Sequence, residues 1–332
     1  MGPHNNDNYG CLSITAQLET SDTHAYTPHD AFAKATPPEP LKGDKASPSR
    51  TPVLPCACVW PEPHTTDLSM KSLSTLTAAE ANRLTGVFFD IDDTVTHNGR
   101  IVPEAFDAFV AARNAGLHLV PITGRPAGWV DHIARAWPVD GVVGENGGLW
   151  FYLADGRMHR CFSQDAETRR QHRAALDRLA THLLASVPGC ALASDQNYRE
   201  LDLAIDFCED VPPLPRSSID AIVHHFEAAG ATCKVSSIHV NGWFGDFNKL
   251  EGCKRFLQDR WNLALGDVRN TWAFVGDSAN DGPMFEYFPL SFGVANVRDF
   301  LDRLETPPTF IADHVGGWGF AQIIARVLDL RA

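Results

Sequence analysis

The sequence lacks several features that mark membrane and secreted proteins. No apolar run reaches the roughly 18 residues that a bilayer-spanning helix needs. The first ten residues, MGPHNNDNYG, have neither a basic stretch nor an apolar core, so they do not resemble a secretory signal. The eight cysteines are scattered, and the close pair Cys56 and Cys58 lacks the spacing of a zinc site. We therefore expect a cytoplasmic protein with reduced thiols and no membrane partner.

Positive charge is also scarce. The chain has 28 Lys and Arg against 41 Asp and Glu, which gives a formal net charge of −13. An acidic surface argues against nucleic acid as a partner. An anionic substrate would therefore need local positive charge from a metal ion or from a few basic residues. The remaining composition, 44% hydrophobic over 332 residues, is ordinary for a globular protein with one or two domains.

Residues 1–84 differ in composition from the rest of the chain. They are rich in Pro, Thr, Ser and His and lack sustained periodicity. Three stretches would interrupt any helix or central strand: PPEP (37–40), SPSRTP (47–52) and WPEP (60–63). We interpret this segment as a disordered extension. Met70 stands one helix before the first expected strand, so residues 1–69 are either regulatory or the product of a mispredicted start.

From Gly86 onward, short apolar runs alternate with helical patterns. The runs typical of buried strands are GVFF (86–89), LHLVPIT (117–123) and DGVVG (140–144). The first intervening helix begins at Pro103, and the second carries Trp129, Ile133 and Trp137 on one stripe. This β-α-β-α-β order predicts an α/β fold with a doubly wound, parallel, Rossmann-like sheet.

The regular alternation stops after the third run. The next segments predict a hairpin that turns at Asp155–Gly156 (149–162), a helix (164–186), an antiparallel strand (199–207), a second helix (217–229) and a strand (231–240). We interpret residues 149–245 as an inserted α+β cap that determines substrate specificity. The core is then residues 85–148 and 246–332, with a helix at 249–261, strands at 271–276, 290–295 and 309–312, and a last helix from about 318.

Acidic side chains stand where buried strands end. Asp90, Asp92 and Asp93 follow GVFF, Asp277 follows TWAFVG, and Thr123 ends the second strand. Ligands of open parallel sheets bind outside the carboxyl ends of the strands, so we expect these side chains to converge. Carboxylates gathered at one spot cost several kcal/mol unless a cation neutralises them. A hard divalent ion with oxygen ligands, Mg²⁺ in a cell, is the natural solution.

Four motifs follow one another in a fixed order: DIDDT (90–94), TGR (123–125), Lys249 and GDSAND (276–281). This set resembles the haloacid dehalogenase superfamily of phosphotransferases over residues 85–332. The insert between the second and third motifs has the position of a C2 cap. Together with GENGG (144–148), it resembles subfamily IIB, which includes Cof-type sugar phosphatases, sucrose-phosphate phosphatase and phosphomannomutase. One departure is Leu250, because Cof-type members usually have Gly after the lysine.

The resemblance implies a Mg²⁺-dependent phosphatase that works through an aspartyl-phosphate. It assigns Asp90 as the nucleophile and Asp92 as the general acid and base. Thr123 and Lys249 would bind the phosphoryl group and complete the catalytic set. The implied metal ligands are Asp90, Asp92 through its backbone carbonyl, Asp277 and Asp281. Further candidates for phosphate or substrate binding are Gly124, Arg125 and Asn280, and Arg125 meets either the phosphate or a carboxylate.

The most suggestive part of the cap is IHVNGWFGDFN (238–248), just before Lys249. His239, Asn241 and Trp243 alternate at a spacing of two, so they could share one strand face and bind a sugar. Alternatively, the strand packs its aromatic side chain inward while the polar residues bond to local backbone. Further polar candidates lie on the other cap strand: Glu200, Asp202 and Asp206.

Three functions fit these residues. The first is a phosphatase of a small phosphorylated metabolite, most simply a sugar phosphate. The second is a sugar phosphomutase of the same superfamily, which passes the phosphoryl group back to the sugar. The third is a receiver-like phospho-signalling module, which Asp92 and the insert argue against. Neither the substrate nor the oligomeric state follows from the residues.

Overall fold

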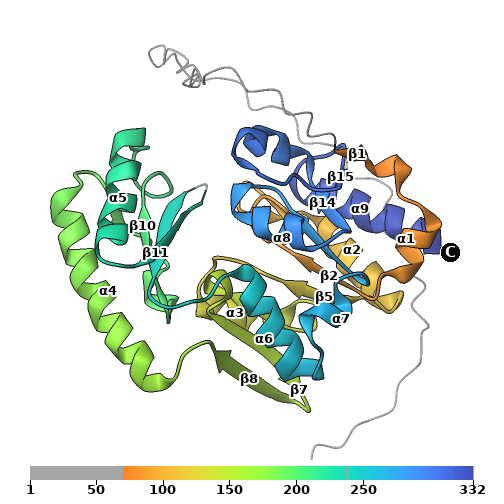
Figure 1. The fold of residues 1–332 in the computed structure, drawn as a ribbon, viewed down its shortest axis with the longest axis horizontal. Helices are drawn as coiled ribbons and strands as arrows, with labels where there is room; N and C mark the ends of the chain where they lie inside the picture. Colours follow the sequence, from red (N-terminus) through yellow and green to blue (C-terminus); the bar gives the residue numbers. More distant parts are fainter. Residues whose placement is uncertain (1–69, 237, 332) are drawn as a thin grey trace, which may run out of the picture. The chain divides into compact units, whose positions relative to one another are not determined.

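The computed structural model describes residues 70–236 and 238–331, so residues 1–69 of the extension predicted at 1–84 lie outside the described residues. Its centre is a six-stranded sheet of order β1-β15-β14-β13-β2-β5, in which every pairing is parallel (Figure 1). The strands are β1 (Lys71–Ser72), β2 (Gly86–Phe89), β5 (His118–Pro121), β13 (Trp272–Gly276), β14 (Ser291–Gly293) and β15 (Phe310–Ile311). The predicted α/β fold with a parallel sheet is confirmed.

Helices cover both faces of this sheet. Successive side chains of β2 point to opposite faces and pack against different helices. Val87 and Phe89 pack in one apolar cluster with side chains of α2 (Pro103–Asn114) and α9 (Gly316–Arg331). Phe88 packs in a second cluster with α6 (Lys249–Trp261) and α8 (Gly282–Tyr287). Burial on both faces explains why the strand sequence is a continuous apolar run rather than an alternating one.

Three further helices and several short strands lie outside the two larger sheets. The helices are α1 (Ala78–Arg83), α3 (Ala127–Ala136) and α7 (Leu265–Val268), and a small hairpin consists of β3 (Thr96–His97) and β4 (Arg100–Ile101). β6 (Val142–Gly144) joins β7 (Leu149–Ala154) and β8 (Arg157–Phe162) in a three-stranded antiparallel sheet. As expected, the β7–β8 hairpin turns at Asp155 and Gly156, whose φ angles of 50° and 71° are left-handed.

The α+β unit predicted between the second and third motifs contains a four-stranded antiparallel sheet of order β11-β12-β10-β9. Its strands are β9 (Ala191–Leu192), β10 (Asp202–Asp206), β11 (Thr232–Val235) and β12 (His239–Trp243). Helices α4 (Ala166–Ser186) and α5 (Arg216–Ala228) pack on one face of this sheet (Figure 1), where Leu203, Ile205 and Val240 share an apolar cluster with their side chains. The exact bounds of this cap stay a prediction.

The single strand predicted at 231–240 is wrong, because a turn divides the segment into β11 and β12. The Ser236 hydroxyl makes the turn: it accepts hydrogen bonds from the backbone N–H groups of Ile238 and His239 and donates to the His239 carbonyl. Serine side chains stabilise turns in this way without glycine or proline. The segment therefore has the composition of one uninterrupted strand.

Residues 71–84 differ from the disordered extension in which we placed them. They form β1, the 3₁₀ helix η1 (Leu73–Thr75) and α1, and they bury Leu73, Leu76, Ala81 and Leu84 in the core. α1 begins with a capping box in which the Thr77 hydroxyl accepts from Glu80 N and the Glu80 carboxylate accepts from Thr77 N. Among the described residues, no helix is long and apolar enough to cross a membrane.

A protein that begins at Gly86 is expected to be less stable than one that begins at Met70. The shorter protein loses the pairing of β1 with β15 and the buried side chains of residues 71–84. Each buried leucine contributes about 1.5–3 kcal/mol before the entropy of ordering is subtracted. Urea denaturation of the two proteins measures the difference, which we expect to be about 3 kcal/mol. Equal midpoints would show that this segment adds nothing to the core.

Candidate active site

The first motif forms a tight turn directly after β2. Asp90 N–H continues the ladder by donating to the Val275 carbonyl at 3.0 Å, so Asp90 is fixed at the end of the strand. The Ile91 carbonyl then accepts from the N–H groups of Thr94 and Val95, at 3.3 and 3.0 Å. Asp93 has a left-handed φ of 56°, which makes it a turn residue. The turn thus presents Asp90 at the carboxyl edge of the sheet.

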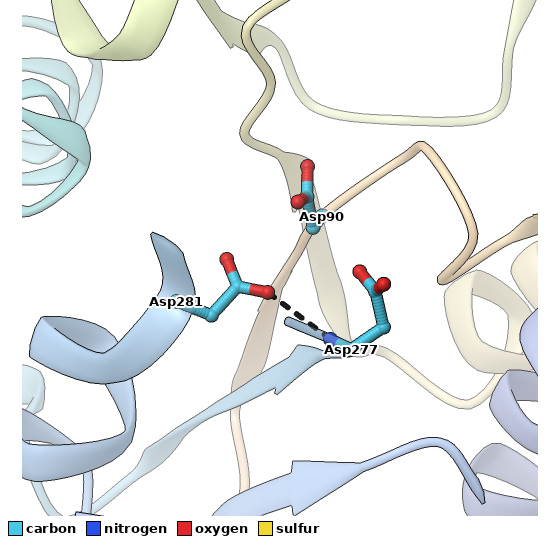
Figure 2. Close-up of side chains that lie close together, drawn as sticks. All are labelled: Asp90, Asp277 and Asp281. Atoms are coloured by element: carbon cyan, nitrogen blue, oxygen red, sulfur yellow. Dashed lines mark hydrogen bonds between the residues drawn. The ribbon is translucent and has the colours of Figure 1, made fainter. Parts of the chain in front are cut away.

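Three carboxylates converge at this edge. Asp90, Asp277 and Asp281 come from the ends of β2 and β13 and from the 3₁₀ helix η4 (Ala279–Asp281), and Figure 2 shows them around one point. One oxygen atom of each lies within 4.8 Å of the others, and all three side chains are buried. Asp281 is anchored because its carboxylate accepts from the backbone N–H of Asp277 at 3.0 Å (Figure 2). The convergence expected from strand order is therefore present.

Lys249 lies between two of these carboxylates. Its Nζ is 2.8 Å from Asp90 Oδ2 and 2.7 Å from Asp281 Oδ1. Burial raises the pKa of Asp90 to about 7, although Lys249 opposes the shift, and burial raises the pKa of Asp277 well above its usual value. Burial also disfavours a charged lysine, but Asp281 and Asp90 together raise the pKa of Lys249 above its ordinary value. One ammonium group thus faces three buried carboxyl groups, an arrangement suited to an added divalent cation.

The position of Lys249 follows from the start of α6. The Asn248 side chain caps the helix by accepting from Glu251 N, which places Lys249 in its first turn. The preceding GENGG loop contacts the same helix end: a Cβ on Gly147, whose φ is 100°, would lie 2.0 Å from the Asn248 carbonyl oxygen. Glycine is therefore required there for the loop to approach α6.

The second motif places Thr123 and Arg125 beside the first motif. The buried Thr123 hydroxyl accepts from Arg125 N at 3.0 Å, which leaves its own hydrogen free to donate. The Arg125 guanidinium bonds the Asp92 carboxylate, with Nε 3.0 Å from both oxygens and Nη2 2.7 Å from Oδ1. Of the two interactions considered for Arg125, the described residues therefore show the one with a carboxylate. A Cβ on Gly124 would lie 3.3 Å from Asn146 Oδ1.

Asn280 lies close to the cluster through its side-chain oxygen. This atom accepts from the Ser278 hydroxyl at 3.0 Å and lies 3.5 Å from Lys249 Nζ. The four motifs therefore come together around Asp90, as their order along the chain predicted.

Two residues that orient Asp277 escaped the sequence analysis. The Thr94 hydroxyl donates to Asp277 Oδ1 at 2.9 Å, and the Asn296 amide donates to Asp277 Oδ2 at 3.2 Å. Asn296 also donates to the Asp93 carbonyl and accepts from Gly316 N, so it joins three segments around Asp277. An isolated Asn some 19 residues after Asp277 carries no motif that could have identified it.

Hydrogen bonds of two buried side chains, Glu145 and Arg199, connect the core with the cap. The Glu145 carboxylate, whose backbone φ is 44°, accepts from four backbone N–H groups: Ala127 in α3 and Glu200, Leu201 and Asp202 in the cap. Burial, reinforced by Asp202, raises the pKa of Glu145 to about 7. Arg199 adds a second link, because its Nη1 donates to the Gly124 carbonyl at 3.0 Å and to the Asp202 carboxylate at 3.1 Å.

The three cap candidates lie on one strand, β12, and share the face opposite α4 and α5. In the antiparallel register Asp206 pairs with His239 and Asp202 with Trp243. Asn241 donates to Asp202 Oδ2 at 3.0 Å, and His239 Nε2 lies 2.8 Å from Glu209 Oε2 without hydrogen-bond geometry. Burial lowers the pKa of His239, although Glu209 opposes the shift.

Trp243 is a packing residue in this structure. It is 1% exposed, belongs to the apolar cluster of the core and stacks on Phe247 with ring centroids 5.4 Å apart. Of the two interpretations given for this strand, the inward-packed aromatic therefore fits Trp243.

Replacing Trp243 with Ala is expected to destabilise the protein by about 3–5 kcal/mol, because it empties a large buried site. Activity per folded molecule should fall equally on p-nitrophenyl phosphate and on a sugar phosphate, since no stacking surface for substrate is lost. Thermal denaturation and parallel rate measurements check both parts. A loss confined to the sugar phosphate would instead place the indole against the substrate.

Comparisons with known proteins bear on this site. Residues 87–175 match the family model for haloacid dehalogenase-like hydrolases. A search of curated protein sequences finds no match. Among solved structures, a Thermoplasma acidophilum protein is 20% identical with a TM-score of 0.58, and the match covers 74% of this chain and 99% of that one.

Two further structures are named for their activity. The sucrose-phosphatase of Synechocystis sp. PCC6803, solved with sucrose and phosphate, is 15% identical with a TM-score of 0.53, covering 74% of this chain and 98% of that one. A sugar phosphatase of haloacid dehalogenase subclass IIB is 12% identical with a TM-score of 0.50. The match covers 74% of this chain and 99% of that one. At these identities the likeness shows the fold alone. The predicted resemblance is confirmed.

Proposed function

We propose that this chain, a haloacid dehalogenase-like hydrolase by its family match and its fold, is a Mg²⁺-dependent phosphatase of a small phosphorylated metabolite. The observation that carries the proposal is the buried cluster of Asp90, Asp277 and Asp281 with Lys249 between two of them. Phosphoryl transfer needs a nucleophile, neutralised charge and accurate positioning more than elaborate covalent chemistry. The cluster offers all three at one edge of the sheet.

The residues of the cluster fit a magnesium ion. Asp90, Asp277 and Asp281 would hold it, together with the backbone carbonyl of Asp92. Three buried carboxyl groups face one lysine, and burial disfavours their charged forms unless a further cation is added. Hard oxygen ligands of this kind are those that Mg²⁺ prefers. When bound, the ion would withdraw charge from the phosphoryl oxygens.

The reaction follows from the roles of the chain's own residues. A carboxylate oxygen of Asp90 attacks phosphorus and the bond to the leaving oxygen breaks, while Asp92, which enters this step in its protonated form, gives that oxygen its proton. Water then attacks the phosphorus of the aspartyl-phosphate and gives a proton to Asp92, which restores Asp90 and releases phosphate. Thr123 donates its free hydroxyl hydrogen to the phosphoryl group, and Lys249 adds positive charge. Gly124 and Asn280 stay candidates for contact with substrate.

The substrate class rests on the cap. His239 and Asn241, on the face of β12 opposite α4 and α5, stay the candidates for binding a sugar phosphate; both are buried in this structure, beside the carboxylates of Asp202 and Glu209. Hydroxyl groups of a sugar pair well with such mixed donors and acceptors. The fold likeness to a sucrose-phosphatase supports the same class.

A screen of metabolite phosphates tests this function. Phosphate release is measured with Mg²⁺, and again after chelation by EDTA, over sugar phosphates, nucleotides, phospho-acids and p-nitrophenyl phosphate. We expect Mg²⁺-dependent release that is fastest with a sugar phosphate. Transfer that requires a sugar bisphosphate and releases no phosphate would indicate a mutase, and inactivity on the whole panel would refute the proposal.

Replacing Asn296 with Ala is expected to weaken Mg²⁺ binding by about 10- to 100-fold, because Asp277 loses the amide that orients its carboxylate. Isothermal titration of the substrate-free protein with Mg²⁺ measures the affinity. Asn82→Ala, the same change at an exposed position of α1, is the matched control and should bind normally. If Asn296→Ala lowers the melting temperature but leaves the Mg²⁺ affinity unchanged, the residue only joins the three segments.

A further inference from the structure

The ion pair between Asp92 and Arg125 involves both carboxylate oxygens. Nε lies 3.0 Å from each oxygen, and Nη2 lies 2.7 Å from Oδ1. A guanidinium is a planar fork whose geometry matches a carboxylate, so such a pair fixes the direction of the carboxylate as well as its charge. Asp92 is a third exposed and needs such a contact to hold one orientation.

Arg125 is itself held firmly. Its guanidinium carbon lies 4.5 Å from the centre of the Trp129 ring, and its side chain is only 12% exposed. Its backbone N–H donates to the Thr123 hydroxyl. The pair with Asp92 is therefore not one of the surface ion pairs that contribute little because their side chains are free to move.

A cap residue lies on the other side of Arg125. Asp195 Oδ2 is 3.9 Å from Arg125 Nη1, and Arg199 holds the Asp195 carboxylate through two contacts of 3.0 and 3.1 Å. Arg199 also donates to the carbonyl of Gly124, the residue before Arg125. A continuous path of ion pairs thus runs from the cap through Arg199, Asp195 and Arg125 to Asp92.

We propose that Arg125 is a positioning residue that orients the Asp92 carboxyl group for proton transfer, with Oδ1 accepting from Nη2 while the other oxygen carries the proton, and that Asp195 makes this orientation depend on the cap. The inference rests on the proposed function, in which Asp92 gives a proton to the leaving oxygen. It differs from a direct contact between Arg125 and the phosphoryl group. Among the described residues, the hydrogen bonds, ion pairs and ring contacts of the Arg125 side chain are with carboxylates and with Trp129.

The leaving group separates these two roles. A general acid matters greatly when a basic oxygen leaves and little when the leaving oxygen is already stable as an anion. Phenyl phosphate and p-nitrophenyl phosphate carry the same phosphoryl group on similar rings, but phenolate is much the more basic leaving group. A residue that positions Asp92 should therefore affect phenyl phosphate selectively. A residue that binds the phosphoryl group should affect both substrates alike.

The test measures kcat/KM on this pair with Mg²⁺, because kcat/KM excludes the later hydrolysis of the aspartyl-phosphate. For Arg125→Met we expect a loss of about 100-fold on phenyl phosphate and less than about 5-fold on p-nitrophenyl phosphate. Arg125→Lys should restore little of the loss, because an ammonium cannot hold both oxygens. Asp195→Asn should give a smaller selective loss of about 5-fold.

Two controls frame the result. Asp92→Asn should show the same selectivity in stronger form. Asp131→Asn, which removes a carboxylate from an ion pair with Arg135 and Arg160, should leave both rates unchanged. Melting curves of every variant confirm that folded proteins are compared.

Each outcome decides the inference. Equal losses on the two substrates, or nearly full activity of Arg125→Lys, would assign Arg125 to the phosphoryl group and overturn it. A selective loss in Arg125→Met with unchanged rates in Asp195→Asn would overturn the dependence on the cap. Wild-type protein that hydrolyses neither aryl phosphate, nor any member of the metabolite panel, would refute the proposed function and this inference with it.

Discussion

Replacing Asp90 with Asn is expected to abolish turnover while the fold stays intact. The amide cannot attack phosphorus, and loss of a nucleophile costs at least about a thousand-fold in rate. The fold should tolerate the change, because an amide oxygen can still accept from Lys249 Nζ at the position of Oδ2, and only the bond from Ile91 N–H to Oδ1 is lost. It also removes one of three neighbouring buried carboxyl groups, whose burial already disfavours charge. Phosphate release and thermal melting measure the two properties.

Asp93→Asn is the matched control for this experiment. It makes the same chemical change three residues along the same turn, where a left-handed φ of 56° suits Asn as well as Asp. Its activity should stay close to that of the wild type. If purified Asp90→Asn keeps more than about a few per cent of the wild-type rate, Asp90 is not the nucleophile.

Replacing Lys249 with Met should have a large effect on both stability and activity. The ammonium lies 2.7–2.8 Å from two buried carboxylates, and removing one partner of such a contact costs about 3–5 kcal/mol. Activity should fall at least about a thousand-fold, because the phosphoryl group loses its positive neighbour. Mg²⁺ should restore part of the lost stability, since a cation bound to the free carboxylates replaces the missing charge.

Lys254→Met provides the comparison within the same helix. Lys254 pairs with Glu251 at 3.4 Å on the exposed side of α6, where an ion pair contributes little. Urea denaturation with and without Mg²⁺ should show a large, Mg²⁺-sensitive loss at position 249 and almost none at 254. A Lys249→Met protein as stable as the wild type without Mg²⁺ would mean that the buried carboxyl groups are neutral.

The core of the site could be predicted because its signals are local. Asp90, Thr123 and Asp277 each stand at the end of an apolar run, and a parallel sheet brings such ends together whatever the rest of the chain does. Lys249 is fixed by the start of a helix whose bounds the sequence pattern predicted well. Strand ends and the helix start were therefore sufficient to place these residues, whereas their expected roles came from the resemblance to the haloacid dehalogenase superfamily.

The remaining contacts depend on distances that no local pattern encodes. The bond from Asn296 to Asp277 and the contact of Arg125 with Asp195 join segments far apart in the chain. Their formation depends on loop paths and on the position of the cap. Similarly, spacing placed Trp243 on the correct strand face but could not show that Phe247 and the core cover it. The sequence pattern can therefore predict which face of a strand a side chain occupies, but not which residues pack against it.

The Glu145 carboxylate has a consequence for how this protein family can change. It holds the entering cap strand entirely through backbone N–H groups, at residues 200–202, and so ignores the side chains there. Natural variation or engineering can therefore exchange the cap for another with different side chains and keep the same attachment. Proline at any of these positions would remove a hydrogen bond to Glu145, because it has no N–H to donate. The contacts with Glu145 are thus defined by the main chain, whereas the second link to the core depends on the side chain of Arg199.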